Sequence, residues 1–359
     1  MRIVIIVHCL TGGGAERVAA MWANGFRERG HEVEVVIFDA DSPRTYALRE
    51  EIRVTVVTSR RRWVVVRIIE RIVRLRKVLK GISPDVVIEA MPSWQRLVAM
   101  AGMGCKKIAT EHDSFEKPTS AKEELGWFNK FWVNRLYSHV TVLTQVDKGV
   151  IGRRLKHVTV LPNPLALEPV KNVPPKEKIV LAVGRKDAWH YKGFDILIKA
   201  WSQVSADTEG WKLQIVGGSD KGGQEYLKDL CHKYGVSESV EFQDYQEDIL
   251  PYYQKASIFV LSSRYEGFGL VLIEAMSQGC ACIACDYKGR QSEIVTNGVS
   301  GVTCEPDHVE ALVEALRKVI DDDELRNQLQ SAAIRRAGDF RIDRIMDRWE
   351  VIFKKCRLS

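Results

Sequence analysis

Two glutamates eight positions apart, Glu266 and Glu274, stand on either side of a glycine turn and an apolar run. Residues 257–262 before them have the pattern of a buried strand, and the apolar spacing from Leu270 onward predicts a helix. In open α/β sheets, ligands bind where the carboxyl end of a strand meets a helix start, and the free N–H groups of residues 267–269 suit an anion such as a diphosphate. Taken alone, two such acids are more often a helix cap and a solvated side chain.

Two basic residues, Arg185 and Lys192, follow another predicted strand at 179–183. Preorganised cations stabilise the charge that a diphosphate gains when its ester bond breaks, and they do so without a metal. A solvated surface loop is the alternative interpretation. Trp189 and His190 lie between the two cations, so their spacing does not define the conformation of the loop.

The first half of the chain has polar groups at two predicted strand ends. After the first strand comes a glycine turn that opens a helix, in which Gly13 and Gly14 would let a ligand approach the backbone. This turn lacks both G-x-G-x-x-G and a Walker lysine, so a plain turn remains open. Glu111 and His112 follow a strand predicted at 107–110, although a lone histidine is more often structural.

Two patterns raise the question of a metal. Asp39-Ala-Asp41 follows a strand, which is the D-x-D arrangement that metal-dependent glycosyltransferases of the GT-A type use, but a polar loop is favoured because Arg185 and Lys192 already supply positive charge. Cys280, Cys282 and Cys285 lack a fourth ligand at zinc-finger spacing, and their apolar neighbours fit a strand beginning near Ala281. We therefore expect no metal site.

The composition is that of an ordinary soluble globular protein. The chain has 359 residues, of which 45% are hydrophobic and 28% charged, and this length exceeds a single core of about 250 to 300 residues. No run approaches the roughly 18 apolar residues of a membrane-spanning helix. The opening Met1–Leu10 fits a buried strand better than a signal peptide, and scattered cysteines fit reduced thiols, so we expect a cytoplasmic protein.

Alternation of strands and helices predicts an α/β fold with two doubly wound parallel sheets. Five prolines between Pro162 and Pro175 place a linker at about 164–177, which separates domains at 1–165 and 176–340. A last helix is predicted within 341–359. The strands are predicted at 3–7, 32–38, 86–89, 107–110 and 140–143, and then at 179–183, 212–217, 240–242, 258–261, 281–284 and 301–304.

The positive charge is concentrated in one segment. The net charge is +6, but residues 1–167 alone carry 27 lysines and arginines against 17 acids. Arg60–Lys80 holds nine basic residues and one acid, with Val64, Ile68, Ile72, Leu75 and Leu79 on one helical face. This pattern fits an ordinary surface helix, or a surface that meets anionic lipid through Arg60, Arg61, Arg62 and Trp63. Nucleic acid is disfavoured because no stacking platform accompanies the charge.

The segment 263–279 resembles the E-x7-E motif of retaining GT-B glycosyltransferases of family 4. This resemblance implies that Glu266 holds hydroxyls of the donor sugar and that Glu274 holds the ribose. Arg185 and Lys192 match the pair of that family that binds the diphosphate. The amides implied to bind the distal phosphate are those of Gly267, Phe268, Gly269 and Leu270.

The resemblance covers nearly the whole chain, because the glycine turn and Glu-His also appear in the family's order. It implies two Rossmann-like domains facing a central cleft, with the last helix packing back on the first domain. Gly13 and Gly14 would lie near the donor phosphate, and Glu111 and His112 near the donor sugar and the acceptor. Among these residues, His112, Glu266, Arg185 and Lys192 are the expected catalytic set.

The implied function is transfer of a hexose or N-acetylhexosamine from a nucleoside diphosphate sugar, with UDP favoured over GDP. The acceptor would be a hydroxyl of a lipopolysaccharide, O-antigen or polyprenyl-linked glycan. The implied mechanism is a front-side displacement without cofactor or metal. The expected location is the cytoplasm, and the basic segment leaves open a peripheral position on the inner face of the plasma membrane. A nucleotide-sugar epimerase of GT-B fold and a non-catalytic glycan-binding module are the alternatives.

Overall fold

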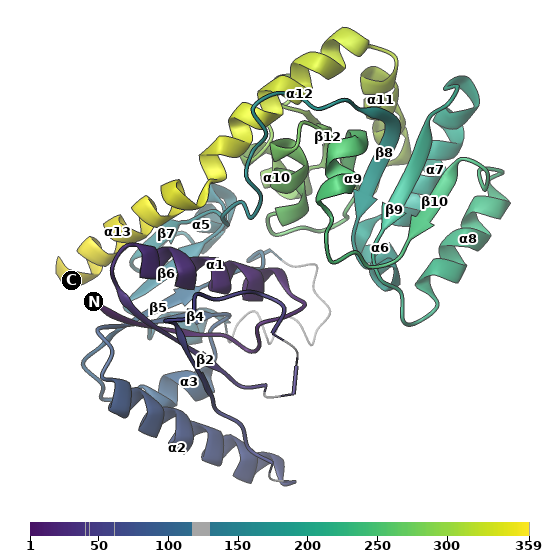
Figure 1. Ribbon diagram of the computed structural model, residues 1–359. Helices are drawn as coiled ribbons and strands as arrows, with labels where there is room; N and C mark the ends of the chain where they lie inside the picture. The colour runs from purple at the N-terminus through teal and green to yellow at the C-terminus, as the bar shows by residue number, and fades with distance from the viewer. Residues whose placement is uncertain (40, 43, 61, 117–129, 359) are drawn as a thin grey trace. The chain divides into compact units, whose positions relative to one another are not determined.

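The computed structural model describes residues 1–39, 41–42, 44–60, 62–116 and 130–358. Arg61, one of the three arginines noted above, lies outside the described residues. The chain forms two compact units: Met1–Pro164 with Ile342–Ser359, and Leu165–Arg341. Each unit is an α/β domain built on one parallel sheet, as the strand-helix alternation predicts (Figure 1).

Unit 1 has a seven-stranded sheet in the order β3-β2-β1-β4-β5-β6-β7. Figure 1 shows α1 and α13 on one face of this sheet and α2 and α3 on the other. The strands are β1 (Arg2–Ile6), β2 (Glu32–Ile37), β3 (Arg53–Val56), β4 (Val86–Ala90), β5 (Lys106–Thr110), β6 (His139–Val142) and β7 (Val158–Val160). The helices are α1 (Gly14–Glu28), α2 (Val64–Ile82), α3 (Trp94–Ala99), α5 (Gln145–Ile151) and α13 (Ile342–Leu358).

Unit 2 has a six-stranded sheet in the order β10-β9-β8-β11-β12-β13. The strands are β8 (Glu177–Val183), β9 (Lys212–Val216), β10 (Val240–Gln243), β11 (Ala256–Leu261), β12 (Ala281–Cys285) and β13 (Val302–Cys304). The helices are α6 (Trp189–Lys192), α7 (Phe194–Val204), α8 (Gly223–Lys233), α9 (Leu250–Lys255), α10 (Leu270–Ser277), α11 (Val309–Ile320) and α12 (Asp323–Ala337), with short 3-10 turns between them.

In both sheets the first strand of the unit lies beside its second and fourth strands. The chain therefore winds outward in both directions from β1 in unit 1 and from β8 in unit 2. Such a reversal of strand order leaves a crevice at the carboxyl ends of the two central strands, where ligands bind in this fold class. The pairs at these switch points are β1 with β4 and β8 with β11.

The last helix, α13, packs on the first, α1, within unit 1. Trp349 is fully buried and meets Trp22 edge to face at 5.1 Å between ring centroids, and it meets Phe26 at 5.5 Å. Arg29 pairs with Asp347 at 2.7 Å on the outside of the same contact. Unit 1 is thus assembled from both ends of the chain.

Helix α2 exposes an apolar face that its sequence pattern does not predict. Leu75 and Leu79 are buried as expected, but Val64, which was assigned to the same buried face, is 57% exposed. The residues Trp63 (78% exposed), Val65, Val66, Ile69 and Val73 are also largely open. Only the second half of the helix packs on the core, through the buried Leu75 and Leu79 and the partly buried Ile72, Val78 and Ile82.

Candidate functional site

The donor-site residues predicted in unit 2 lie at the ends of two neighbouring strands. Arg185 follows β8, and Glu266 with the glycine turn follows β11, the partner of β8 at the switch point. Lys192 ends the short helix α6. The sheet topology, rather than closeness in sequence, brings these three side chains to one end of unit 2.

Lys192 and Glu266 form a direct ion pair, with 2.9 Å between Nζ and Oε2. Both side chains are mostly buried, and the Ser263 hydroxyl donates to the same carboxylate oxygen at 3.2 Å. Arg185 is exposed, and among the residues that the structure describes none pairs with its guanidinium. Lys192 is therefore paired with Glu266, whereas Arg185 is open to an anion.

The loop that carries Lys192 is seated against the end of β11. Gly193 has φ +66°, and a Cβ there would lie 1.9 Å from the Ser262 carbonyl oxygen, so no other residue fits. The Ser262 hydroxyl donates to the Lys192 carbonyl at 2.8 Å. Arg264 grips Asp195 with two hydrogen bonds of 2.7 and 2.8 Å, and this bonding raises the pKa of the guanidinium. Arg264 lies inside the E-x7-E segment, yet sequence reasoning gave it no role.

The glycine turn between Glu266 and α10 is fixed from two sides. Gly269 caps α10 with φ +95°, a conformation that favours glycine. Phe268 is buried and packs edge to face on Phe340 at 5.7 Å. The Gln291 amide donates to the carbonyls of Phe268 at 3.4 Å and Glu266 at 3.5 Å. The turn is preorganised, and Gln291 is another residue that the sequence did not single out.

Glu274 lies in α10 with a buried side chain. Its Oε2 accepts a hydrogen bond from the hydroxyl of Tyr253, which is fully buried, at 3.1 Å. Tyr253 comes from α9, just before β11. A buried tyrosine therefore orients the carboxylate that the resemblance assigns to the ribose, and nothing in the sequence links the two.

In unit 1 the first glycine turn begins α1 as expected. Gly12 has φ +80°, and Gly13 is the N-cap of the helix that Gly14 opens. The Glu16 carboxylate folds back over Gly13, where a Cβ would lie 1.9 Å from Oε2. The Tyr46 hydroxyl donates to the Gly13 carbonyl at 3.2 Å.

Glu111 and His112 follow β5, but their environments differ. Glu111 is buried, with Oε2 paired to Lys130 at 2.6 Å and Oε1 accepting from Asn134 at 2.6 Å. Both of its oxygens are thus engaged within unit 1. His112 lies 5.5 Å from the Trp22 ring, and burial lowers its pKa to about 4, so its imidazole is neutral at pH 7. A neutral imidazole exchanges hydrogen bonds with hydroxyl groups.

A further buried acid, Glu89, is the next-to-last residue of β4 at the switch point of unit 1. Its carboxyl accepts from the Tyr137 hydroxyl and from the backbone N–H of Ser93. Burial raises the pKa of Glu89 to about 7. No sequence pattern singles out Glu89, because it lies within an apolar strand pattern.

The two patterns that raised the question of a metal have other structural roles. Asp39 Oδ1 accepts from the backbone N–H of Asp41 at 3.0 Å and of Ser42 at 3.3 Å, which closes a polar turn. Cys280, Cys282 and Cys285 are buried at β12. Within the described ranges, no group of three or more His, Cys, Asp or Glu residues is placed to hold a metal ion.

Family models match both units. Residues 166–336 match the model described as Glycosyl transferases group 1, and residues 12–168 match Glycosyltransferase Family 4. The chain is a GT-B glycosyltransferase of this type. The E-x7-E segment and the Arg185/Lys192 loop lie inside the first match, and the first glycine turn and Glu-His lie inside the second.

Two curated relatives and one solved structure match this glycosyltransferase over nearly its full length. It is 28% identical to the amylovoran biosynthesis glycosyltransferase AmsD of Erwinia amylovora, over 98% of each chain. It is also 28% identical to a Campylobacter jejuni N-acetylgalactosaminyltransferase that acts on an undecaprenol-linked glycan, over 97% of each chain. Anabaena HepE in complex with UDP and glucose has a TM-score of 0.82 at 20% identity and covers 99% of this chain and 100% of its own.

Proposed function

We propose that the glycosyltransferase moves a hexose or N-acetylhexosamine from a UDP-sugar to a hydroxyl of a lipid-linked or cell-surface glycan, with retention of the anomeric configuration. The observation that carries this proposal is the 2.9 Å contact between Lys192 and Glu266 beside the preorganised glycine turn. A cation that binds phosphate and an acid that binds sugar hydroxyls are expected on either side of the bond between sugar and phosphate. The contact between Lys192 and Glu266 supports this assignment.

The proposed chemistry is a front-side displacement that needs no metal. The bond from the anomeric carbon to the phosphate oxygen breaks, and a bond to the acceptor oxygen forms on the same face. The leaving phosphate takes the acceptor's proton. Arg185, Lys192 and the amides of the turn at 267–270 stabilise the charge that develops on the nucleoside diphosphate. Glu266 orients the sugar, and Glu274, held by Tyr253, orients the ribose.

In unit 1 we assign His112 to contact with hydroxyl groups of donor sugar or acceptor, because its depressed pKa keeps the imidazole neutral. Gly13 and Gly14 begin α1 and offer helix N–H groups to phosphate. Glu111, whose oxygens are held by Lys130 and Asn134, acts by fixing the backbone before His112.

UDP and a lipid-linked acceptor are favoured by what the relatives are described as binding. HepE is described in complex with UDP-glucose, and the Campylobacter enzyme with an undecaprenol-linked glycan as substrate. We carry both to this chain as a proposal, with GDP as the second donor candidate.

The proposed partner of unit 1 is an anionic membrane surface on the cytoplasmic side. No described helix is long and apolar enough to span a bilayer. The first half of α2 instead exposes Val65, Ile69 and Val73 on one face, with Trp63 before them. The exposed basic residues Arg60, Arg62, Lys77 and Lys80 accompany this face. An apolar stripe edged by cations is typical of a helix that lies in the interface of an anionic bilayer.

The decisive experiment supplies the full chain with UDP- and GDP-sugars and with lipid-linked or lipopolysaccharide acceptors in EDTA, and follows nucleoside diphosphate release. We expect release that requires both donor and acceptor, and a product whose anomeric proton coupling matches that of the donor. Arg185→Met should abolish most turnover, whereas Lys178→Met at the other end of β8 should not. Strict dependence on Mn²⁺, inversion of configuration, or equal consumption of donor without acceptor would each refute the proposal.

A further inference from the structure

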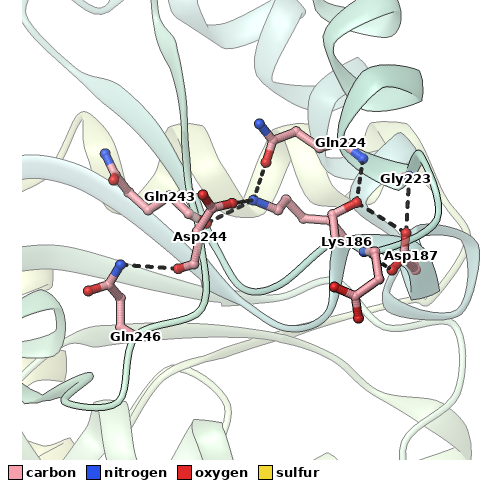
Figure 2. Close-up of polar contacts among 9 residues, drawn as sticks. Lys186, Asp187, Gly223, Gln224, Gln243, Asp244 and Gln246 are labelled. Atoms are coloured by element: carbon pink, nitrogen blue, oxygen red, sulfur yellow. Dashed lines mark hydrogen bonds and ion pairs between the residues drawn. The ribbon is translucent and has the colours of Figure 1, made fainter.

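A buried lysine lies directly beside the proposed diphosphate-binding arginine. Lys186 follows Arg185 at the end of β8, and its side chain is 0% exposed. Its Nζ donates to the Gln243 carbonyl at 2.9 Å, lies 3.3 Å from Asp244 Oδ1, and bonds Gln224 Oε1 (Figure 2). An ammonium group has three donors, and all three have an acceptor here.

The acceptors belong to two different segments of unit 2. Gln243 ends β10 and Asp244 begins the loop to α9, whereas Gln224 lies in the first turn of α8. Since β9 separates β8 from β10 in the sheet, Lys186 reaches past a whole strand. The Gln246 amide donates to the Asp244 carbonyl at 3.2 Å and closes the start of the loop (Figure 2). Lys186 thus joins the end of β8 to the end of β10 and to the start of α8.

Asp187, the residue after Lys186, fixes the loop that leads into α8. Asp187 accepts from the backbone N–H of Asp220 at 2.7 Å and of Gly223 at 3.1 Å, and these bonds lower its pKa. A Cβ on Gly223 would lie 2.4 Å from the Lys186 carbonyl oxygen, so α8 starts against the backbone of this turn. The surroundings of Lys186 are rigid and closely packed.

A gain in folding stability does not by itself explain why a lysine is buried at position 186. An apolar side chain of similar volume is often as stable as a buried ion pair. The one acidic partner, Asp244, has a side chain that is 85% exposed, and the contact is long at 3.3 Å. The Lys186 ammonium holds three oxygens from two segments in a fixed geometry, and a methionine side chain cannot do this.

We infer that Lys186 is a positioning residue that holds residues 243–246 as the nucleobase end of the donor site. The inference rests on the proposed nucleotide-sugar donor. Arg185 is the residue proposed to bind the diphosphate, and its neighbour Lys186 fixes the loop at the end of β10. These two adjacent residues therefore set the distance between the diphosphate end and the nucleobase end of the donor site. The loop offers the base main-chain groups and the ring of Tyr245, which is 72% exposed.

The test compares the binding of UDP, UMP and inorganic pyrophosphate by calorimetry in the full chain. Lys186→Met keeps the volume and removes the donors, and Lys178→Met, at an exposed residue of β8, is the matched control. We expect Lys186→Met to weaken the binding of UDP and of UMP by the same factor of about ten, which is the usual effect of losing hydrogen bonds to a charged group. Pyrophosphate affinity should stay within about twofold of the wild type, because Arg185 and Lys192 are untouched.

An equal loss of pyrophosphate affinity would overturn the inference, because it would mean that Lys186 acts on the diphosphate by general attraction. Unchanged UMP affinity would also overturn it. If Lys186→Met does not fold, Asp244→Ala decides, since this exposed change removes the side-chain acceptor. Weaker UMP binding with unchanged pyrophosphate binding supports the role, and unchanged UMP binding rejects it. A wild-type chain that binds neither UDP nor GDP would refute the proposed function itself.

Discussion

Lys192 Nζ lies 2.9 Å from Glu266 Oε2, although the two residues are 74 positions apart in the chain. The resemblance assigns one of them to the diphosphate and the other to the sugar. If Lys192 binds the diphosphate as we propose, a ligand phosphate competes with Glu266 for the ammonium. Changes at either residue will therefore alter the binding of both parts of the donor.

Glu266→Gln should separate turnover from nucleotide affinity. The amide keeps the size but loses the charge that orients the sugar, so we expect kcat to fall by about 10² or more. UDP affinity should be equal or tighter, because Lys192 is freed from its carboxylate partner. Steady-state kinetics and calorimetry with UDP measure the two effects, and Glu238→Gln on the exposed surface is the control. A tenfold loss of UDP affinity with normal kcat would contradict this division.

Tyr253→Phe should weaken nucleotide binding without touching the ligand. It removes the 3.1 Å hydrogen bond to Glu274, and we expect UDP affinity to fall about three- to tenfold, with a larger fall for Glu274→Ala. The neighbouring Tyr252→Phe serves as the control. The double variant Tyr253→Phe with Glu274→Ala should bind no more weakly than Glu274→Ala alone, because both act through one carboxylate. Additive losses would show that Tyr253 acts elsewhere.

Glu89 should make stability depend on pH. Its pKa is about 7 in the folded chain and near 4.5 when unfolded, so the unfolded state ionises first and stability falls as pH rises from about 4.5 to about 7. Glu89→Gln lacks this loss, so at pH 8 its free energy of unfolding should exceed that of the wild type by on the order of 2 kcal/mol. Urea unfolding at pH 5 and pH 8, with Glu51→Gln as an exposed control, checks the sign. A variant that gains stability only at pH 5 would reject the assignment.

The exposed face of α2 should govern attachment to lipid. Changing Val65, Ile69 and Val73 together to Gln leaves the buried Leu75 and Leu79 in place, so we expect normal folding but much weaker sedimentation with vesicles rich in phosphatidylglycerol. Val351→Gln on α13 is a control for an exposed valine. Changing Arg60 and Arg62 to Gln should reduce binding to anionic vesicles and its dependence on salt. Binding to anionic vesicles that survives both sets of changes would exclude this surface.

Most of the fold follows from the sequence because strands and helices alternate with strong apolar patterns. The strands β3 and β7 do not stand out in the sequence. Both are short edge strands whose residues are only partly buried, so their apolar pattern is weak. The same limit applies to α2. Periodicity correctly marks Leu75 and Leu79 as buried, but it cannot show that Val64, on the same helical face, is exposed.

The residues proposed to bind the donor are easier to single out in the sequence than the residues that hold them. Arg185 and Lys192 match one pair of the family and Glu266 belongs to the separate E-x7-E motif, so each has a local pattern that points to it. Their supports, Tyr253 and Gln291, act from separate elements across the fold, and no local spacing connects them to the motif. Lys186 was visible only as one more polar residue of a loop, since burial of its charge depends on β10 and α8.

The packing of α13 has a consequence for how the protein is made. Unit 2 is one continuous stretch, so all of its residues have been synthesised before the last helix. Residues 1–164 of unit 1 are synthesised before unit 2 but lack the 17 residues of α13, which cover Trp22 and Phe26, until that helix has been made. Unit 1 therefore completes its packing after all of unit 2 has been synthesised, and its uncovered aromatic surface is open to aggregation in the meantime.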